Sequence, residues 1–393
     1  MMKTYKRVIY AFVLFVFVLN GCKDGGETAP KNKYLVSSTL VREFATKDEV
    51  VRSLGTLGAQ VALFVRSGVK QYRIVYKTKN TDGTEITASG GLAVPIGLTE
   101  SLPLASLQHG TIINDADAPS YFGANSEGQI GSFLATTGYI VAMPDYIGYG
   151  ESKNLPHSYE HREGLATASL DFIRAVKEFI AENKVNWNNS LYLTGYSEGG
   201  FATLSLFKKI QDETGTEFNL KAVTAGSGAY NKTESFRRLV SQPSSAAPSS
   251  TNLYIWVLLT YDRIYKLNRP ASSYFKEPFA TAVQTNKQFA NISTSLHLTV
   301  TDAFRNGVIN ATDTPLINAI KDNDVHDWKP AKPLKLFYGD ADDLVPGFNT
   351  TTTLAAMKAR GANVESKLTP GGTHGSTIND YLLGTFEFFS LNK

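Results

Sequence analysis

The stretch from Leu191 to Phe201, reading LYLTGYSEGGF, constrains the fold of this chain more than any other. A short apolar run leads into the letters GYSEG at 195–199, and a helical pattern begins at about Gly200. This is a G-x-S-x-G motif between a strand and a helix, the context in which a serine is held on a sharp turn as a nucleophile. Such a turn needs unfavourable backbone angles and neighbours without bulk, which explains the glycines on both sides. The alternative is a glycine-rich turn in which Ser197 only caps the helix.

The remaining pattern predicts strands that alternate with helices after an initial antiparallel pair. Strands at 71–79 and 84–95 are joined by Asn80-Thr81-Asp82-Gly83, a strong hairpin signal, and residues 34–68 read as one or two short helices before them. Further strands are expected at 102–108, 139–144, 191–195, 220–225, 334–338 and 364–368, and helices at 160–181, about 200–211, 350–360 and 376–390. This alternation predicts an α/β fold with a mostly parallel sheet, an antiparallel N-terminal hairpin and helices on both faces.

The stretch 229–331 interrupts the alternation between two strands that should be neighbours in the sheet. It contains a loop rich in serine, proline and alanine at 241–250 and an apolar aromatic segment, LYIWVLL, at 253–259. We expect a largely helical insertion that forms a cap over the carboxyl edge of the sheet. Its aromatic residues either line a pocket or pack the cap onto the core; they are Tyr254, Trp256, Tyr261, Tyr265, Tyr274 and Phe275.

The N-terminus carries an export signal. Three basic residues precede an unbroken apolar run, Val8–Leu19, which is short for a membrane span and typical of a signal peptide. The run ends in LNGC at 19–22 and resembles a bacterial lipoprotein signal, which implies that residues 1–21 are removed and that Cys22 carries lipid. Residues 22–33 then form a flexible tether, and 34–393 form the domain. This resemblance implies anchoring in the cell envelope, at the outer membrane; a plain secretory signal is the alternative.

Charge and cysteine content exclude other classes. The chain has 39 basic and 36 acidic residues, and removing 1–21 takes away three basic residues and no acidic ones, which leaves 36 of each. A balanced chain without a basic cluster argues against nucleic acid as a partner. The single cysteine excludes an internal disulfide.

A serine nucleophile needs a base and an orienting carboxylate. His374 lies in the glycine-rich segment PGGTHGS at 370–376, between the last strand and the last helix, which is the expected place for the base. The acid lies in GDADDLVP at 339–346, directly after a strand. The spacing favours Asp342, with Asp343 as runner-up and Asp340 as a turn residue.

The other histidines have structural interpretations. His157 and His161 flank a helix start and are expected at the surface or as capping groups, and His109 is expected to be structural. His297 and His326 fall in the insertion. For the oxyanion of a tetrahedral intermediate, the expected donors are the backbone N–H groups of Glu198 and Thr111, with Ile112 next to Thr111 as the alternative.

Together these motifs resemble the α/β-hydrolase superfamily. The matching residues are HGT at 109–111, DYIGYGES at 145–152, GYSEGG at 195–200, GDADDLVP at 339–346 and His374. Within the superfamily, DYIGYG and the helix that follows are similar to secretory lipases and related bacterial esterases. The resemblance implies hydrolysis of small-molecule or lipid esters through an acyl-enzyme, with Ser197, Asp342 and His374 as the triad and with no metal or cofactor.

Two other functions stay open at this point. An exopeptidase on the same fold would need a carboxylate near the nucleophile to anchor its substrate, for which Glu198 or Glu127 is available. A surface binding protein that retains an unused hydrolase fold is the second alternative.

Overall fold

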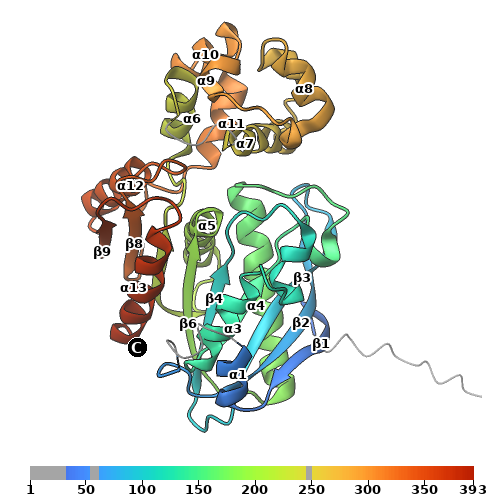
Figure 1. Ribbon diagram of the computed structural model, residues 1–393, viewed down its shortest axis with the longest axis vertical. Coiled ribbons are helices and arrows are strands. Elements are labelled where there is room, and N and C mark those ends of the chain that lie inside the picture. Colours follow the sequence, from blue (N-terminus) through green and yellow to red (C-terminus); the bar gives the residue numbers. More distant parts are fainter. Residues whose placement is uncertain (1–31, 54–61, 245–249) are drawn as a thin grey trace, which may run out of the picture. The chain divides into compact units, whose positions relative to one another are not determined.

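A nine-stranded sheet forms the centre of the protein. The computed structural model describes residues 32–53, 62–244 and 250–393 (Figure 1). The strands are arranged in the order β1-β2-β3-β5-β4-β6-β7-β8-β9. Their bounds are β1 Leu35–Phe44, β2 Gly68–Lys79, β3 Glu85–Ile96, β4 Leu102–Gln108, β5 Ile140–Pro144, β6 Trp187–Tyr196, β7 Asn219–Gly226, β8 Leu334–Gly339 and β9 Val364–Thr369.

The pairing confirms the predicted fold class. Strands β2 and β3 form the antiparallel hairpin, closing at Lys79 opposite Glu85 across the predicted turn. Strand β3 pairs antiparallel with β5, and all pairs from β5 through β4, β6, β7 and β8 to β9 are parallel. Because the carboxyl ends of parallel strands meet at one edge, the segments that follow β4, β6, β8 and β9 converge there.

The expectation of helices at 34–68 is wrong for most of the described part of that segment. Residues Leu35–Phe44 form the edge strand β1, antiparallel to β2, and only Lys47–Ser53 is helical (α1); residues 54–61 lie outside the described part. Of the ten residues in β1 only Leu35 is buried, so its mixed apolar spacing reflects an exposed edge rather than a helix face. The strand start is held by the Glu178 carboxylate, which accepts hydrogen bonds from the backbone N–H groups of residues 33–35.

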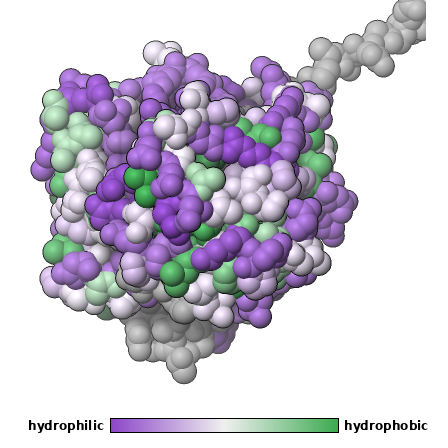
Figure 2. All heavy atoms as spheres, turned by 90° about the horizontal axis from the view of Figure 1, so that it is seen from above, coloured by the Kyte–Doolittle hydropathy of each residue, from purple (hydrophilic) through white to green (hydrophobic). Residues whose placement is uncertain are grey.

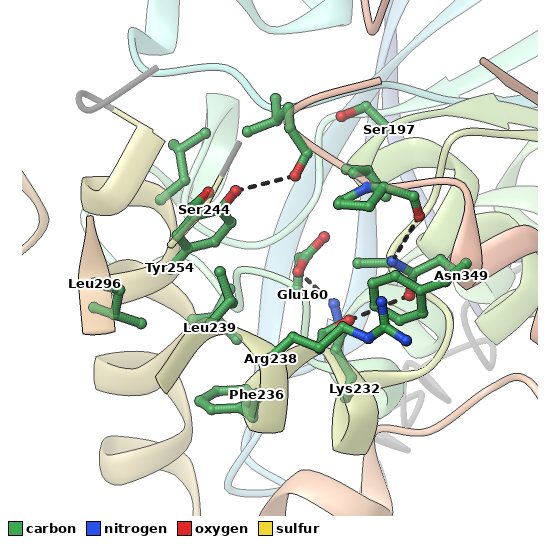
Figure 3. A pocket seen from close by; sticks show the side chains of 18 of the residues that line it. Glu160, Ser197, Lys232, Phe236, Arg238, Leu239, Ser244, Tyr254, Leu296 and Asn349 are labelled. Carbon is green, nitrogen blue, oxygen red and sulfur yellow. Dashed lines mark hydrogen bonds and ion pairs between the residues drawn. The ribbon is translucent and has the colours of Figure 1, made fainter. Parts of the chain in front are cut away.

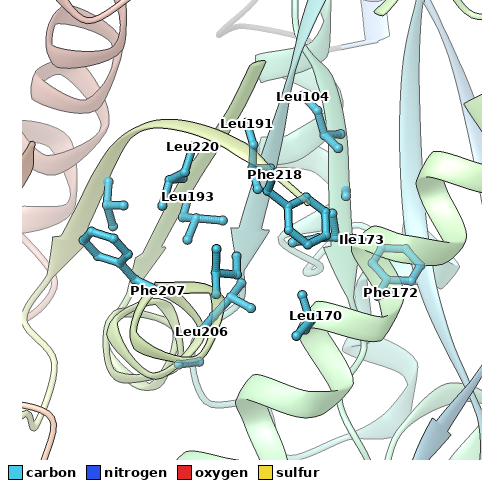
Figure 4. Packing of buried hydrophobic residues seen from close by; sticks show 14 of the residues in the cluster. Leu104, Leu170, Phe172, Ile173, Leu191, Leu193, Leu206, Phe207, Phe218 and Leu220 are labelled. Atoms are coloured by element: carbon cyan, nitrogen blue, oxygen red, sulfur yellow. The ribbon is translucent and has the colours of Figure 1, made fainter. Parts of the chain in front are cut away.

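Helices cover both faces of the sheet, because successive strand residues point to opposite sides. Leu104 and Leu191 pack against α4 (Arg162–Asn183) and α5 (Glu198–Glu213) in one hydrophobic core (Figure 4). Their neighbours Ala105 and Tyr192 belong to a second core with α1, α3 (Gly128–Thr136) and α13 (Thr377–Leu391). Helix α12 (Phe348–Ala359) connects β8 to β9.

Between β7 and β8 the chain forms a group of helices, which we call the cap helices. They are α6 Lys232–Ser241, α7 Thr251–Ile264, α8 Phe279–Asn286, α9 Leu296–Thr299, α10 Asp302–Ile309 and α11 Thr314–Asp322. The cap helices stand beyond one end of the sheet (Figure 1) and have a hydrophobic core of their own, built around residues such as Ile255, Tyr261 and Leu316. No helix in the described part of the chain is long and apolar enough to cross a membrane.

Candidate active site

Ser197 occupies a strained turn between β6 and α5. Its backbone angles are φ 60° and ψ −123°, a conformation that residues with a side chain rarely adopt. A Cβ added to Gly195 would lie 2.3 Å from the carbonyl oxygen of Gly199, and one added to Gly199 would lie 2.0 Å from that of Gln108. Only glycine fits at either position, so the glycines of the motif are required by the close approach of α5 to the strand ends.

The structure brings Ser197, His374 and Asp342 into one hydrogen-bonded chain. The Nε2 atom of His374 lies 2.9 Å from Oγ of Ser197, and its Nδ1 lies 2.9 Å from Oδ2 of Asp342. His374 follows β9 in the loop before α13, and its carbonyl oxygen accepts a hydrogen bond from the Tyr196 hydroxyl at 2.7 Å. The residue next to the serine therefore also holds the loop that carries the histidine.

The three aspartates after β8 have different partners. Asp342, whose side chain is fully buried, contacts His374 and accepts hydrogen bonds from the backbone N–H groups of Leu344 and Val345. The carboxylate of Asp340 accepts from the Gly371 N–H and so braces the loop on the other side. Asp343 is half-buried and makes no hydrogen bond to the imidazole among the described residues. Of the three, Asp342 is the aspartate whose hydrogen bond to the imidazole of His374 the structure shows.

Both expected oxyanion residues lie near Ser197. Glu198 is the first residue of α5, so its backbone N–H is among those that a helix start leaves without an intrahelical partner. Thr111 and Ser197 line the same cavity, and the hydroxyl of Thr111 lies 2.9 Å from that of Tyr159. The structure thus brings both residues close to Ser197.

A buried pair behind the nucleophile was missed by the sequence prediction. His157 is buried rather than at the surface, and its Nε2 lies 2.8 Å from Oε1 of Glu198. Its Nδ1 lies 2.6 Å from the carbonyl oxygen of Ile147, and its own carbonyl accepts from Arg263 of the cap helices. His161, in contrast, is the expected cap: its side chain accepts from the Gly164 N–H at the start of α4. No local pattern distinguishes the two histidines, because the partner of His157 lies 41 residues further along the chain.

A cavity of about 270 Å³ opens beside Ser197 (Figure 3). Its walls come from the loop around Tyr159, from α6 and α7 of the cap helices, and from the segment after Asp342. Of the six cap aromatics, Tyr254 lines this cavity and donates a hydrogen bond to the carbonyl of Leu344. Tyr261, Tyr274 and Phe275 are buried in the core of the cap helices, so packing is their main role.

Comparison with known proteins shows the family to which this chain belongs. The sequence profile of the secretory lipase family matches residues 128–374, a span of more than half of the chain that contains Ser197, Asp342 and His374. The chain belongs to the secretory lipase family. Membership supports a hydrolase of the lipase or esterase kind. No curated protein matches the sequence.

Solved structures share the fold. The Legionella pneumophila protein lpg1103 is 26% identical over 91% of this chain and 98% of its own, with a TM-score of 0.79. The rice cell wall degrading esterase LipA from Xanthomonas oryzae, in a ligand-bound form, is 24% identical over 90% of this chain and 95% of its own, with a TM-score of 0.74. Candida antarctica lipase A is 17% identical over 89% of this chain and 82% of its own, with a TM-score of 0.60.

The two glutamates considered as peptidase anchors are engaged elsewhere in this secretory lipase fold. The Glu198 carboxylate is 1% exposed and contacts His157. Glu127 accepts a hydrogen bond from the Gly110 N–H at 2.7 Å and is absent from the cavity wall. Desolvation raises the pKa of Glu127, which further weakens it as a site for a substrate ammonium group.

Two further expectations stay predictions. Within the described ranges, no group of three or more histidine, cysteine, aspartate or glutamate side chains could hold a metal ion. Cys22, the expected lipidation site, lies outside the described residues, as do the signal peptide at 1–21 and most of the tether.

Proposed function

We propose that this protein is a carboxylic-ester hydrolase in which Ser197 is the nucleophile, His374 the general base and acid, and Asp342 the orienting carboxylate. The observation that carries the proposal is the hydrogen-bonded chain from Asp342 through His374 to Ser197. The Oδ2–Nδ1 and Nε2–Oγ distances are both 2.9 Å. These distances match the reach that proton transfer from a serine hydroxyl requires.

The proposed reaction runs through an acyl-enzyme. Ser197 attacks the ester carbonyl while His374 accepts its proton, and the backbone N–H groups of Glu198 and Thr111 stabilise the oxyanion. His374 then returns the proton to the departing alcohol, and a water molecule, activated by the same imidazole, releases the acid. The strained backbone angles at Ser197 present its hydroxyl to the cavity, and the positive dipole end of α5 points to the same place.

We further propose that the substrates are esters of modest size. The cavity of about 270 Å³ lies just below the range of about 300–1,000 Å³ that is usual for ligand pockets. Seen from the side of the cap helices, the described surface is mostly hydrophilic, and hydrophobic residues form only small separate spots (Figure 2). An enzyme that works on lipid aggregates is expected to expose a continuous apolar patch there.

Hydrolysis of p-nitrophenyl esters with acyl chains of two to sixteen carbons tests this proposal. We expect the highest kcat/KM at short chains and a loss of about a million-fold in kcat for Ser197→Ala, as in other serine hydrolases. Ser205→Ala is the matched control, because Ser205 lies in the helix that follows Ser197 and, within the described residues, its hydroxyl donates to the carbonyl of Phe201. Full activity of Ser197→Ala, or cleavage of aminoacyl-naphthylamides without cleavage of esters, contradicts the proposal.

For the location of the protein, we propose that residues 1–21 are cleaved and that Cys22 carries the lipid. More than one acyl chain is needed for stable anchoring, since one chain alone binds membranes weakly. The polar residues up to 33 then tether the hydrolase domain at the outer membrane.

A further inference from the structure

A buried ion pair forms one wall of the cavity beside Ser197. Glu160 lies just before α4, and Lys232 begins α6 of the cap helices. Their side chains are 12% and 2% exposed, and Nζ of Lys232 contacts Oε2 of Glu160. Figure 3 shows Glu160 between Ser197 and Lys232, with Leu239 across the cavity.

Burying this ion pair costs free energy, and the need to join the cap helices to the rest of the domain does not explain that cost. Removing two charges from water costs several kcal/mol per ion before their attraction is counted. Burial accordingly raises the pKa of Glu160 and lowers that of Lys232, while each partner opposes the shift of the other. The same segment already reaches the cap helices through Arg162, which forms an exposed ion pair with Asp322 at 2.9 Å.

The wall also keeps hydrogen-bonding capacity that faces the cavity. Within the part of the chain that the structure describes, Oε1 of Glu160 receives no hydrogen bond, whereas Oε2 is held by Lys232. Nζ of Lys232 in addition lies 4.0 Å from the centre of the Phe201 ring, which fixes the ammonium in place. A group that enters the cavity therefore meets a free carboxylate oxygen on one side and, opposite it, the side chains of Phe236, Leu239 and Leu296.

We propose that Glu160 and Lys232 form a polar subsite that selects esters carrying a hydroxyl group on the part that enters the cavity. The hydroxyl donates to Oε1 of Glu160 and accepts from the ammonium of Lys232, and the carbon chain lies against the apolar wall. A plain alkyl chain would instead shield the carboxylate from water without replacing its hydrogen bond, which is unfavourable. This inference rests on the proposed ester hydrolysis at Ser197 and adds the substrate class.

Matched ester series test the subsite. One series consists of methyl hexanoate and its derivatives with a hydroxyl or a methoxy group at carbon 3 or carbon 6. The other consists of hexyl acetate and its 6-hydroxy and 6-methoxy derivatives, so that the two series separate an acyl from an alcohol occupant. Acid release is followed by titration at constant pH. We expect one hydroxylated ester to exceed both its plain and its methoxy counterpart about 10- to 100-fold in kcat/KM, the range for a hydrogen bond to a charged group.

The variant Glu160→Met/Lys232→Met removes both charges and both hydrogen-bonding groups while it keeps side chains of similar size, and it leaves no buried charge unpaired. We expect it to reduce the hydroxyl preference to within about threefold. Arg162→Gln/Asp322→Asn is the matched control, because it breaks an ion pair that links the neighbouring residue Arg162 to α11 of the cap helices outside the cavity, and it should leave the preference unchanged.

Two outcomes overturn the inference, and a third overturns the proposed function on which it rests. Equal rates for plain and hydroxylated esters in the unmodified protein would mean that the wall does not select a hydroxyl. An unchanged preference in Glu160→Met/Lys232→Met, with only a lower melting temperature, would mean that the pair is structural. No hydrolysis of any ester would instead refute the proposed function itself, so the two failures are distinguishable.

Discussion

The change Asp342→Asn tests the proposed chemistry most directly. The carboxylate lies 2.9 Å from Nδ1 of His374, and its side chain is fully buried. When the imidazole takes the proton of Ser197, a positive charge develops at that distance. At an effective dielectric constant of about 20, the attraction between two unit charges at this separation is about 6 kcal/mol. At about 1.36 kcal/mol per factor of ten, losing it lowers kcat about ten-thousand-fold.

Asparagine keeps the size of the side chain, and its amide oxygen can still accept from the N–H groups of Leu344 and Val345. The loss should therefore appear in kcat for p-nitrophenyl butyrate and not in the melting temperature. Asp343→Asn, at the half-buried neighbouring position, should stay within about threefold of the unmodified protein. Retention of more than a tenth of the activity by Asp342→Asn, or a comparable loss in Asp343→Asn, would refute the assignment.

Three further changes test other parts of the molecule. Gly199→Ala places a Cβ 2.0 Å from the Gln108 carbonyl oxygen, so it should lower kcat and the melting temperature and destabilise the fold by at least about 1–3 kcal/mol. Gly215→Ala is the control: its Cβ meets nothing within 4 Å, so it should cost only about 1 kcal/mol of stability, because of its positive φ. Burial lowers the pKa of His161 from 6.5 to about 4, so the unfolded chain binds a proton that the folded protein does not, and stability present above pH 6.5 is lost as the pH falls to 4. His161→Asn retains the helix cap and should remove about 3 kcal/mol of that loss in urea unfolding measured at both pH values, whereas an unchanged pH dependence would contradict the burial argument. Cys22→Ser should move the protein from the membrane to the soluble fraction, and a variant that stays membrane-bound would refute the lipid anchor.

The sheet and the candidate triad were predictable because their signals are local. The strained turn at Ser197 has room only for glycine at positions 195 and 199, so the motif that marks the turn is visible within five consecutive residues. The positions of Asp342 and His374 follow from the fold, since each comes directly after a parallel strand whose carboxyl end lies at the same edge. Each of these residues could be found without knowledge of distant contacts.

The errors concern residues whose environment is set by distant segments. Strand β1 is an edge strand with one buried side chain, so it lacks the alternation that identifies a strand and gains its hydrogen bonds from β2. His157 and His161 have similar neighbours in the sequence, but only His157 meets the carboxylate of Glu198. A polar residue near a helix start is usually exposed. The burial of His157 becomes visible only when its segment and the start of α5 are considered together.

The same reasoning separates the chemistry of this protein from its specificity. Ser197, Asp342 and His374 follow strands β6, β8 and β9, whose positions are set by strand pairing within the sheet. The cavity wall, in contrast, combines Glu160 from the sheet side with Lys232 and Leu239 from the cap side. The apolar periodicity of the cap helices predicts their own core around residues such as Tyr261. It does not predict which few side chains face the cavity. Substitutions at those cavity positions should therefore change which ester is preferred while the reaction at Ser197 continues. If a cap substitution abolished the reaction of Ser197 with a phosphonate probe in a stably folded protein, reactivity and specificity would be coupled.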